Sequence, residues 1–397
     1  GAIPFILSGA IPHPIDAIFE TVSGFTTTGS SILTDVEILP KSVLFWRSFT
    51  HWIGGMGVLV FILCLLPLTG GYHMNLMKAE SPGPSVSKLV PKVQSTAKIL
   101  YTIYIILTIV EIIFLLIGKM PLFDTLCLSF GTAGTGGFGI KNDSIASYST
   151  YNQVVITVFM ILFGINFNAY YLLLTKKVMQ AAKNEEVRYY LGIIGLAIVA
   201  IAINTREMFT SFGRAFQQAA FQVGSIITTT GYATTDFNVW PVFSKTILVI
   251  LMFVGACAGS TGGGIKVSRL LILCKSARKE LQLYLHPNAV KKIKMDDKAI
   301  PHEVVRATNM FLFVYIMIFV TSLLIISLDN LDMVSNFTAI AATLNNIGPG
   351  LGAVGPTGNF NTYSYISKGV MIFDMLAGRL EVFPLLLLFK RDTWRKF

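Results

Sequence analysis

The sequence predicts an all-α integral membrane protein built from four unequal copies of one unit. Each unit consists of a membrane helix, a short pore helix with a filter loop, and a second membrane helix, so the copies are related by a pseudo-four-fold axis. Three features predict this fold: the hydropathy of the chain, the placement of its basic residues, and a repeated segment that ends in glycine. In the third unit, we expect one membrane helix to be broken.

The hydropathy of the chain is too high for a soluble globular protein. Of the 397 residues, 53% are hydrophobic and only 13% are charged, whereas soluble domains have about 25% charged residues. Crossing a hydrocarbon core takes roughly 20 apolar residues. The candidate spans are Val43–Leu68, Ile99–Ile117, Val154–Leu174, Leu191–Ile203, Thr246–Phe253 continuing beyond Gly264, Phe311–Leu328 and Val370–Phe389.

The cysteines and histidines show no ligand spacing. The four cysteines are scattered without a CxxC pair, so we interpret them as core residues rather than as a metal site or a disulfide framework. The five histidines form no HxxxH or HExxH pair, which removes the usual sequence support for a metallohydrolase. We therefore expect no cofactor in this chain.

The basic residues gather in alternate connecting segments. The four basic blocks are Lys78–Lys98, Lys176–Arg188, Lys275–Arg306 and Lys390–Lys396. By the positive-inside rule, these blocks face the cytoplasm. Because the blocks recur at one topological position, the net charge of +10 indicates orientation in a lipid bilayer rather than binding to nucleic acid.

A short semi-apolar segment between each pair of membrane crossings forms the repeat. Aligned on their final glycines, the four segments end at Gly29, Gly136, Gly231 and Gly348, which are 107, 95 and 117 residues apart. The first and third share the run Thr-Thr-Thr-Gly. Non-helical backbone at membrane depth is tolerated only where protein buries it or water reaches it. We therefore expect the four segments to line one cavity.

Each short segment has the signals of a pore helix. Proline fits the first turn of a helix, where the backbone N–H groups have no partner, and Asp, Ser and Thr cap helix starts. The candidate starts are Pro14, Pro121, Thr210 or Ser211, and Asp332 or Ser335. The C-terminal end of each helix, which carries a partial negative charge, would point at the turn and favour a cation there.

The four loops and three further strings carry a family resemblance. The strings are Trp52–Gly57, Ala79–Pro84 and Asn345–Gly350. With the loops, they make the chain resemble, nearly end to end, the TrkH branch of the Trk/Ktr/HKT potassium transporters. Rings of backbone carbonyls replace the hydration shell of an ion in such filters, and glycine permits the backbone conformation this requires.

The resemblance implies a site, a substrate and partners. The filter positions it implies are Thr27, Thr28 and Gly29; Gly134, Thr135 and Gly136; Thr229, Thr230 and Gly231; and Asn346, Ile347 and Gly348. In the family, serine in place of the first filter glycine accompanies sodium permeation, so four glycines favour potassium as the transported ion. The resemblance also implies a homodimer in the bacterial plasma or inner membrane, and a cytoplasmic nucleotide-binding ring of the TrkA type.

The four units divide the chain unequally. We predict a first unit over residues 1–72, a second over 73–182, a third over 183–284, and a fourth with a cytoplasmic tail over 285–397. The chain begins at Gly1 without methionine, and its first unit lacks nearly all of the leading helix found in the family. We therefore expect the sequence to be a fragment or a truncated product.

A glycine-rich run interrupts the second helix of the third unit. Broken helices at membrane depth usually line a substrate path, although small residues also serve tight helix packing. The resemblance implies a movable gate beneath the filter. The gate residues are Gly255, Gly259, Ser260, Thr261, Gly262, Gly263 and Gly264.

A charged residue inside the last apolar stretch needs a partner or water. An intramembrane arginine costs about 2.5–3.5 kcal/mol on insertion scales. Arg379 could pair with Asp374 or Glu381, or reach the membrane surface; the resemblance instead implies a positive barrier in the pore. We also expect a polar partner for Arg47, and a supporting role for Glu20 in the first pore loop.

Two other functional classes remain to be compared. A secondary transporter that couples the cation to sodium or protons would need acidic groups within the membrane, and the candidates are Glu20, Glu111, Asp374 and Glu381. A membrane enzyme is disfavoured because no nucleophile, base and orienting residue can be assembled from recognisable motifs.

Overall fold

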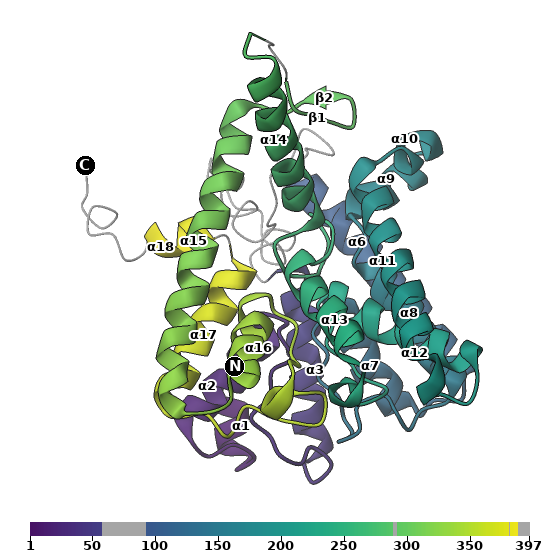
Figure 1. Ribbon diagram of the computed structural model, residues 1–397. Coiled ribbons are helices and arrows are strands. Elements are labelled where there is room, and N and C mark those ends of the chain that lie inside the picture. The colour runs from purple at the N-terminus through teal and green to yellow at the C-terminus, as the bar shows by residue number, and fades with distance from the viewer. Residues whose placement is uncertain (58–92, 289–291, 381, 388–397) are drawn as a thin grey trace.

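The computed structural model describes residues 1–57, 93–288, 292–380 and 382–387. Over these residues the regular secondary structure is almost entirely helical, which confirms the predicted all-α fold (Figure 1). The one sheet among them is a short antiparallel hairpin of β1 (Lys294–Met295) and β2 (Lys298–Ala299), with Lys294 opposite Ala299.

The first half of the chain contains two of the predicted units. In the first unit, the helices are α1 (Ile3–Leu7), the pore helix α2 (Pro14–Phe25) and α3 (Lys41–Met56). In the second unit, they are α6 (Val93–Ile117), the pore helix α7 (Leu122–Gly134), α8 (Thr150–Phe163) and α9 (Phe167–Leu174). In the second unit, the pore helix α7 lies between the longer helices α6 and α8, whereas in the first unit the helix before α2 is the five-residue α1.

The second half repeats this order. The helix α10 (Val178–Ala182) ends the predicted second unit. The third unit has α11 (Glu185–Asn204), η1 (Arg206–Met208), the pore helix α12 (Phe212–Ile227), η2 (Phe237–Val239), α13 (Val242–Val254) and α14 (Val267–Leu285). The fourth has α15 (His302–Ile326), η3 (Ser327–Asp329), the pore helix α16 (Met333–Leu344), η4 (Gly352–Val354), α17 (Tyr365–Arg379) and α18 (Val382–Leu387). The gap between α13 and α14 confirms the broken helix of the third unit.

Three described helical segments are long and apolar enough to cross a membrane: Ala97–Ile117, Glu185–Asn204 and His302–Asp329. The stretch Val154–Leu174, predicted as one span, is instead the pair α8 and α9, bent by 90°. The bend has a local cause, because Gly164 ends α8 and the side chain of Asn166 caps α9 by accepting from the Asn168 N–H at 2.9 Å. Sequence reasoning missed this second break.

The pore helices begin where the sequence predicts. Pro14 is the first residue of α2, and Pro121 immediately precedes α7. The side chain of Ser211 accepts from the Arg214 N–H at 3.2 Å at the start of α12, and Asp332 accepts from the Ser335 N–H at 3.0 Å at the start of α16. Local capping chemistry therefore fixes where these four short helices start.

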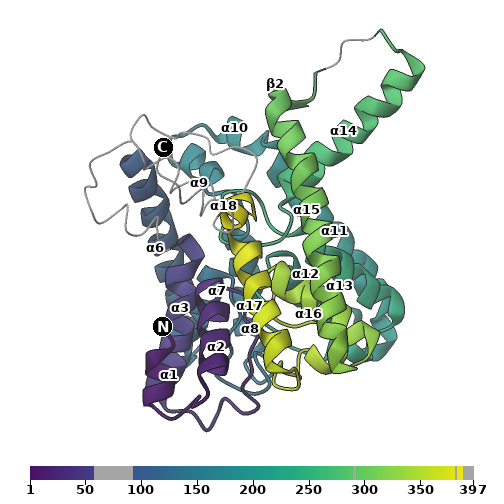
Figure 2. The ribbon, with the colours of Figure 1, turned by 90° about the vertical axis from the view of Figure 1, so that its left-hand side faces the viewer.

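The basic segments of the middle of the chain share one end of the molecule. Figures 1 and 2 show α9, α10, the far end of α14 and the β1–β2 hairpin together at that end, with the pore helices in the other half. This places Lys176–Lys183, Lys275–Lys279 and Lys292–Lys298 on the same side, as the positive-inside rule requires. Lys78, Lys88, Lys92 and the tail from residue 388 lie outside the described residues.

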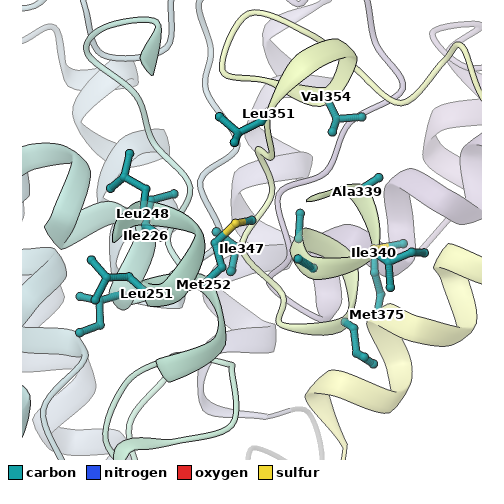
Figure 3. Packing of buried hydrophobic residues seen from close by; sticks show 14 of the residues in the cluster. Ile226, Leu248, Leu251, Met252, Ala339, Ile340, Ile347, Leu351, Val354 and Met375 are labelled. Carbon is teal, nitrogen blue, oxygen red and sulfur yellow. The ribbon is translucent and has the colours of Figure 1, made fainter. Parts of the chain in front are cut away.

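Apolar packing joins the third and fourth units around the fourth pore loop. Figure 3 shows Ile347 of the fourth pore loop next to Met252 of α13, with Leu251 beyond it, and Ile340 with Met375 on the opposite side. These side chains are almost fully buried, so they hold the pore helices by dispersion and the hydrophobic effect rather than by charge. Among the described cysteines, Cys127 and Cys257 are buried as expected, whereas Cys274 is exposed on the part of α14 that extends beyond the core.

Candidate functional site

The four pore loops share one backbone conformation. In the first, third and fourth loops, φ is positive at Thr27, Thr229 and Asn346 (55°, 60° and 56°) and again two residues later at the predicted filter glycine. The values at Gly29, Gly231 and Gly348 are 79°, 84° and 97°. Such φ values favour glycine, because side chains of L-residues clash there.

The second loop follows the same pattern one residue later than predicted. Its positive φ values are 55° at Thr135 and 76° at Gly137. The N–H of Gly136 donates to Gly131 O at 2.9 Å, as the N–H of Thr28 does to Ser23 O, so Gly136 corresponds to Thr28. The alignment on Gly136 is therefore wrong by one residue. The run Gly-Thr-Gly-Gly offers two adjacent glycines, and composition alone cannot choose between them.

The four glycines of the corrected register close a ring. A Cβ at Gly29 would overlap the carbonyl oxygen of Gly136, and one at Gly137 would overlap that of Thr230. Around the ring, Gly231 meets the Ile347 carbonyl in the same way, and Gly348 lies next to the Thr28 carbonyl. Each unit thus packs its glycine against a carbonyl of the next unit, and the fourth returns to the first.

A cavity of about 170 Å³ lies at the mouth of this ring, and all four ring glycines line it. The neighbouring polar side chains bond within the protein. Thr28 Oγ1 lies 2.8 Å from Thr26 Oγ1 and accepts from Asn346 Nδ2 at 2.8 Å. In the third loop, Thr228 and Thr230 form the equivalent hydroxyl pair at 2.7 Å.

A buried ion pair supports the first pore loop. Arg47 of α3 contacts the Glu20 carboxylate at 2.8 Å, and both side chains are at most 2% exposed. Glu20 also accepts from the Ile32 N–H at 3.2 Å and from the Ser31 hydroxyl at 3.0 Å, while Arg47 donates to Gly139 O at 3.2 Å. Both sequence predictions are confirmed: Arg47 has a polar partner, and Glu20 supports the loop.

A fully buried histidine joins the first and second units. His51 Nδ1 lies 2.8 Å from Gly24 O, and His51 Nε2 accepts from the Phe138 N–H at 3.2 Å. The imidazole also lies where a Cβ at Gly136 would fall. His51 therefore helps to fix the distance between two adjacent loops of the ring.

The glycine-rich loop between α13 and α14 lies against the inner ends of the third and fourth pore loops. The N–H of Gly263 donates to Thr229 Oγ1 at 2.6 Å. A Cβ at Gly262 would lie 2.8 Å from Thr228 O, and one at Gly263 would lie 2.5 Å from Asn345 O. Because no side chain fits there, glycine brings the loop backbone directly against the pore loops.

Arg379, at the end of α17, contacts this loop and the first unit together. Its guanidinium donates to Thr261 O at 2.6 Å, to Gly54 O at 2.5 Å and to Gly55 O at 2.7 Å. Asp374, one of its predicted partners, instead accepts from the Ser322 hydroxyl at 2.8 Å. The other predicted partner, Glu381, lies outside the described residues.

The comparisons with known proteins match the same family along nearly the whole chain. Residues 2–394 match the family TrkH, described as a cation transport protein. The chain belongs to the TrkH family. It is similar to "Trk system potassium uptake protein TrkH" of Escherichia coli strain K12, with 38% identity over all of this chain and 83% of that protein. It is also similar to the Escherichia coli protein named TrkG, with 34% identity over 96% of this chain and 79% of that protein.

A solved TrkH structure has the same fold as this chain. The crystal structure of the potassium transporter TrkH from Vibrio parahaemolyticus matches with a TM-score of 0.88 and 35% identity, over all of this chain and 82% of that one. As a member of the TrkH family, the chain is a multi-pass membrane transporter of the bacterial inner membrane, and not an enzyme. Family membership also confirms the resemblance drawn from the motifs.

Four residues that shape this site in the TrkH fold were missed by sequence reasoning. Gly54 and Gly55 supply the carbonyls that receive Arg379, and Gly137 replaces Gly136 in the ring. Glu186, in the first turn of α11, binds the backbone of the glycine-rich loop. Acidic residues are common in the first turn of a helix, and Glu185 directly precedes Glu186 there, so the local sequence gave no signal of this role.

Proposed function

We propose that the protein takes up potassium through a channel-like pore whose selectivity filter is a ring of backbone carbonyls. The curated relatives are named potassium uptake proteins, which supports potassium as the transported ion. The filter residues would be Thr27–Gly29, Thr135–Gly137, Thr229–Gly231 and Asn346–Gly348, with the second loop in its corrected register. Potassium is substrate here, not a resident cofactor.

The observation that carries this proposal is the closed ring of four glycines around one cavity. A dehydrated cation needs several oxygens of comparable strength to water, and carbonyls supply them without burying a formal charge. The C-terminal ends of four pore helices add partial negative charge at the same place. Together these groups favour a monovalent cation over an anion.

The gate in this proposal has two parts in contact: the loop Gly255–Gly264 and Arg379. The loop would block the path below the filter, and the guanidinium would add a positive barrier to it. Contact between Arg379 and Thr261 O at 2.6 Å supports a single constriction. Opening would require the loop to leave the pore loops, and the positive φ of Gly255, Gly259 and Gly264 gives the backbone hinges for such a change.

The proposal also includes a homodimer and a cytoplasmic regulatory ring of the TrkA type. The relatives are named as parts of a "Trk system", which supports a multi-part assembly. The long basic segment Lys275–Lys298 exceeds what orientation requires and offers a contact surface. Co-purification with a TrkA-like protein, lost after neutralising Lys291, Lys292 and Lys294, would support this contact; unchanged binding would contradict it.

Cation flux into liposomes tests the central claim. Purified protein is reconstituted, and uptake of potassium, rubidium, sodium, lithium and a larger organic cation is compared. We expect potassium and rubidium to enter fastest. Equal entry of sodium and potassium would contradict the carbonyl filter.

Coupled transport is the second candidate, favoured by two fully buried carboxyl groups in membrane helices, Glu111 of α6 and Asp374 of α17. A proton-coupled mechanism needs such groups to bind and release a proton. The same liposomes, loaded with a pH-sensitive dye, separate the two mechanisms. Potassium entry that acidifies or alkalinises the lumen with fixed stoichiometry, and stops in Glu111→Gln or Asp374→Asn, would favour coupling over a channel-like pore.

A further inference from the structure

One buried carboxylate holds the intramembrane loop on both sides of its glycines. Glu186 is 2% exposed, and its Oε1 accepts from the Ala258 N–H at 2.7 Å and from the Ser268 N–H at 3.1 Å. Ala258 precedes the run Gly259–Gly264, whereas Ser268 lies in the first turn of α14. A single side chain from α11 therefore draws the two arms of the loop together.

A buried lysine completes this arrangement from within the loop. Lys266 is fully buried, has a left-handed backbone with φ of 75°, and donates from Nζ to Gly262 O and, at 3.5 Å, to Cys257 O. A non-glycine residue at positive φ is strained, so its side-chain bonds must compensate. Glu186 and Lys266 thus bind backbone groups of opposite polarity in one short segment.

The second unit is tied to the same place. Asn166, at the bend between α8 and α9, donates to Glu186 Oε2 at 3.4 Å. The Phe167 N–H donates to Gly259 O at 3.0 Å, and the Cys257 N–H donates to Gly164 O at 3.0 Å. The bend between α8 and α9, which sequence reasoning missed, therefore supplies the surface to which the loop is hydrogen-bonded.

We propose that Glu186 is a positioning residue for the gate. Its carboxylate holds the loop closed beneath the filter until the hydrogen bonds from the two backbone N–H groups are released. The inference rests on the proposed gating role of the loop. Hydrogen bonds to a charged acceptor are stronger than neutral ones, so one carboxylate with two such bonds is a strong anchor. Removing it frees the loop at both arms without touching the ring of glycines above.

The neighbouring residue offers a matched control. Glu185 precedes Glu186 in the same helical turn, but it pairs with Lys275 at 2.5 Å and is 25% exposed. None of the hydrogen bonds between described residues joins Glu185 to the loop. Glu185→Ala therefore removes the same charge from the same helix end and leaves the loop anchored.

Cys257 reports on the loop directly, because it lies within the loop and is fully buried. In a background with Cys64→Ser, Cys127→Ser and Cys274→Ser, the rate at which a small maleimide labels Cys257 measures how often the loop opens. We expect Glu186→Ala to raise this rate by about tenfold or more, because the loop then loses two hydrogen bonds to a charged acceptor. Glu185→Ala should leave it unchanged.

Glu186→Gln distinguishes loss of the loop's anchor from a general folding defect. Its amide oxygen can still accept hydrogen bonds from both backbone N–H groups, but the side chain carries no charge. Its labelling rate should lie between those of the unmodified protein and Glu186→Ala, and it carries the comparison if Glu186→Ala does not elute as folded protein. Unchanged labelling in folded Glu186 variants would overturn the inference. A rise of equal size in Glu185→Ala would also overturn it.

Flux in liposomes links the anchor to transport. We expect Glu186→Ala to raise potassium flux and to keep the preference for potassium over sodium. Faster labelling without faster flux would leave the anchor in place and show that the loop is not the gate, which is a failure of the proposed function. Loss of selectivity in Glu186→Ala with Cys257 still protected would mean that Glu186 acts on the filter, and would overturn the inference.

Discussion

The ring of pore loops and the intramembrane loop are both built on glycine, yet they are stabilised differently. In the ring, four copies of one backbone conformation pack against one another in a closed circle, and each glycine meets a carbonyl of the next unit. Within the described parts of the four units, the intramembrane loop occurs in the third unit alone, and it is held by a few side chains, chiefly Glu186, Lys266 and Arg379.

We expect this difference to separate a rigid part, the ring, from a movable part, the proposed gate. A closed ring of backbone contacts has no single bond whose loss opens it, because each unit is braced on two sides. A loop fastened by a few charged side chains can be released when those bonds are exchanged for others. Selectivity and gating can therefore be altered by different substitutions, and four tests follow.

The largest effect should come from breaking the ring. In Gly29→Ser, a side chain would occupy a backbone with φ of 79° and would overlap the Gly136 carbonyl; left-handed backbone alone costs about 1–2 kcal/mol for a non-glycine residue. We expect weaker discrimination against sodium in liposome flux. Gly192→Ser, on open surface of α11, should retain selectivity. Full potassium selectivity in Gly29→Ser would contradict the ring as the filter.

The second effect concerns the support of the ring. Arg47→Leu would leave the Glu20 carboxylate buried without its ion pair, and breaking such a pair costs about 3–5 kcal/mol. We expect a lower midpoint of thermal aggregation in detergent, together with reduced flux. The exposed pair Arg206–Glu207, at 63% and 84% exposure, is the control, since surface pairs contribute about 0–1 kcal/mol. Equal losses in Arg47→Leu and Arg206→Leu would refute the supporting role.

The third test acts on the movable part. Arg379→Ala removes the positive barrier, and deletion of Ala256–Gly259 shortens the loop, so each should raise cation flux by about tenfold, or roughly 1.4 kcal/mol of barrier. Potassium preference should remain. Because the two elements touch, the double variant should gain less than the sum of the two free-energy changes.

Arg306→Ala, at an exposed arginine of α15, controls for loss of charge. If Arg379→Ala elutes normally in size exclusion but lowers flux, the residue is a structural hydrogen-bond donor and not a barrier.

The smallest effect should come from a helix cap outside the membrane helices. Hydrogen bonds from Ser335 lower the pKa of Asp332, so its carboxylate stabilises the folded state above the ordinary Asp pKa, and this contribution disappears as the pH falls through the lowered value. Asp332→Ala should cost about 1 kcal/mol at pH 7 and nothing once the pH lies below that value. Asp332→Asn still caps the helix and should stay close to the unmodified protein at pH 7. Thermal unfolding at the two pH values measures this.

The parts of the fold that follow local chemistry could be predicted from the sequence. Pro14, Ser211 and Asp332 mark helix starts because capping depends on adjacent residues. The register at Gly136 and Gly137 could not be predicted, because it depends on which glycine meets the Thr230 carbonyl of another unit. The boundaries of the four units stay a prediction.

The site was predictable where residue types are rare in membranes and hidden where they are common. Arg379 stands out because a charge in an apolar stretch demands an explanation, yet its acceptors, the carbonyls of Gly54 and Gly55, are backbone groups far away in sequence. Glu186 lies at the start of a helix, where acidic residues are ordinary. Only the folded chain shows that its carboxylate faces the loop and not water.

If the intramembrane loop is the gate that we propose, its occurrence in one unit among the described residues has a consequence for how the pore opens. A barrier made by four equivalent elements would close symmetrically, because each element would move the same distance, and partly open intermediates would exist. A barrier that one unit supplies moves as a single segment. Here the loop packs on the bend between α8 and α9 and is hydrogen-bonded to Arg379. Opening within one chain should therefore be an all-or-none event without graded levels of conduction.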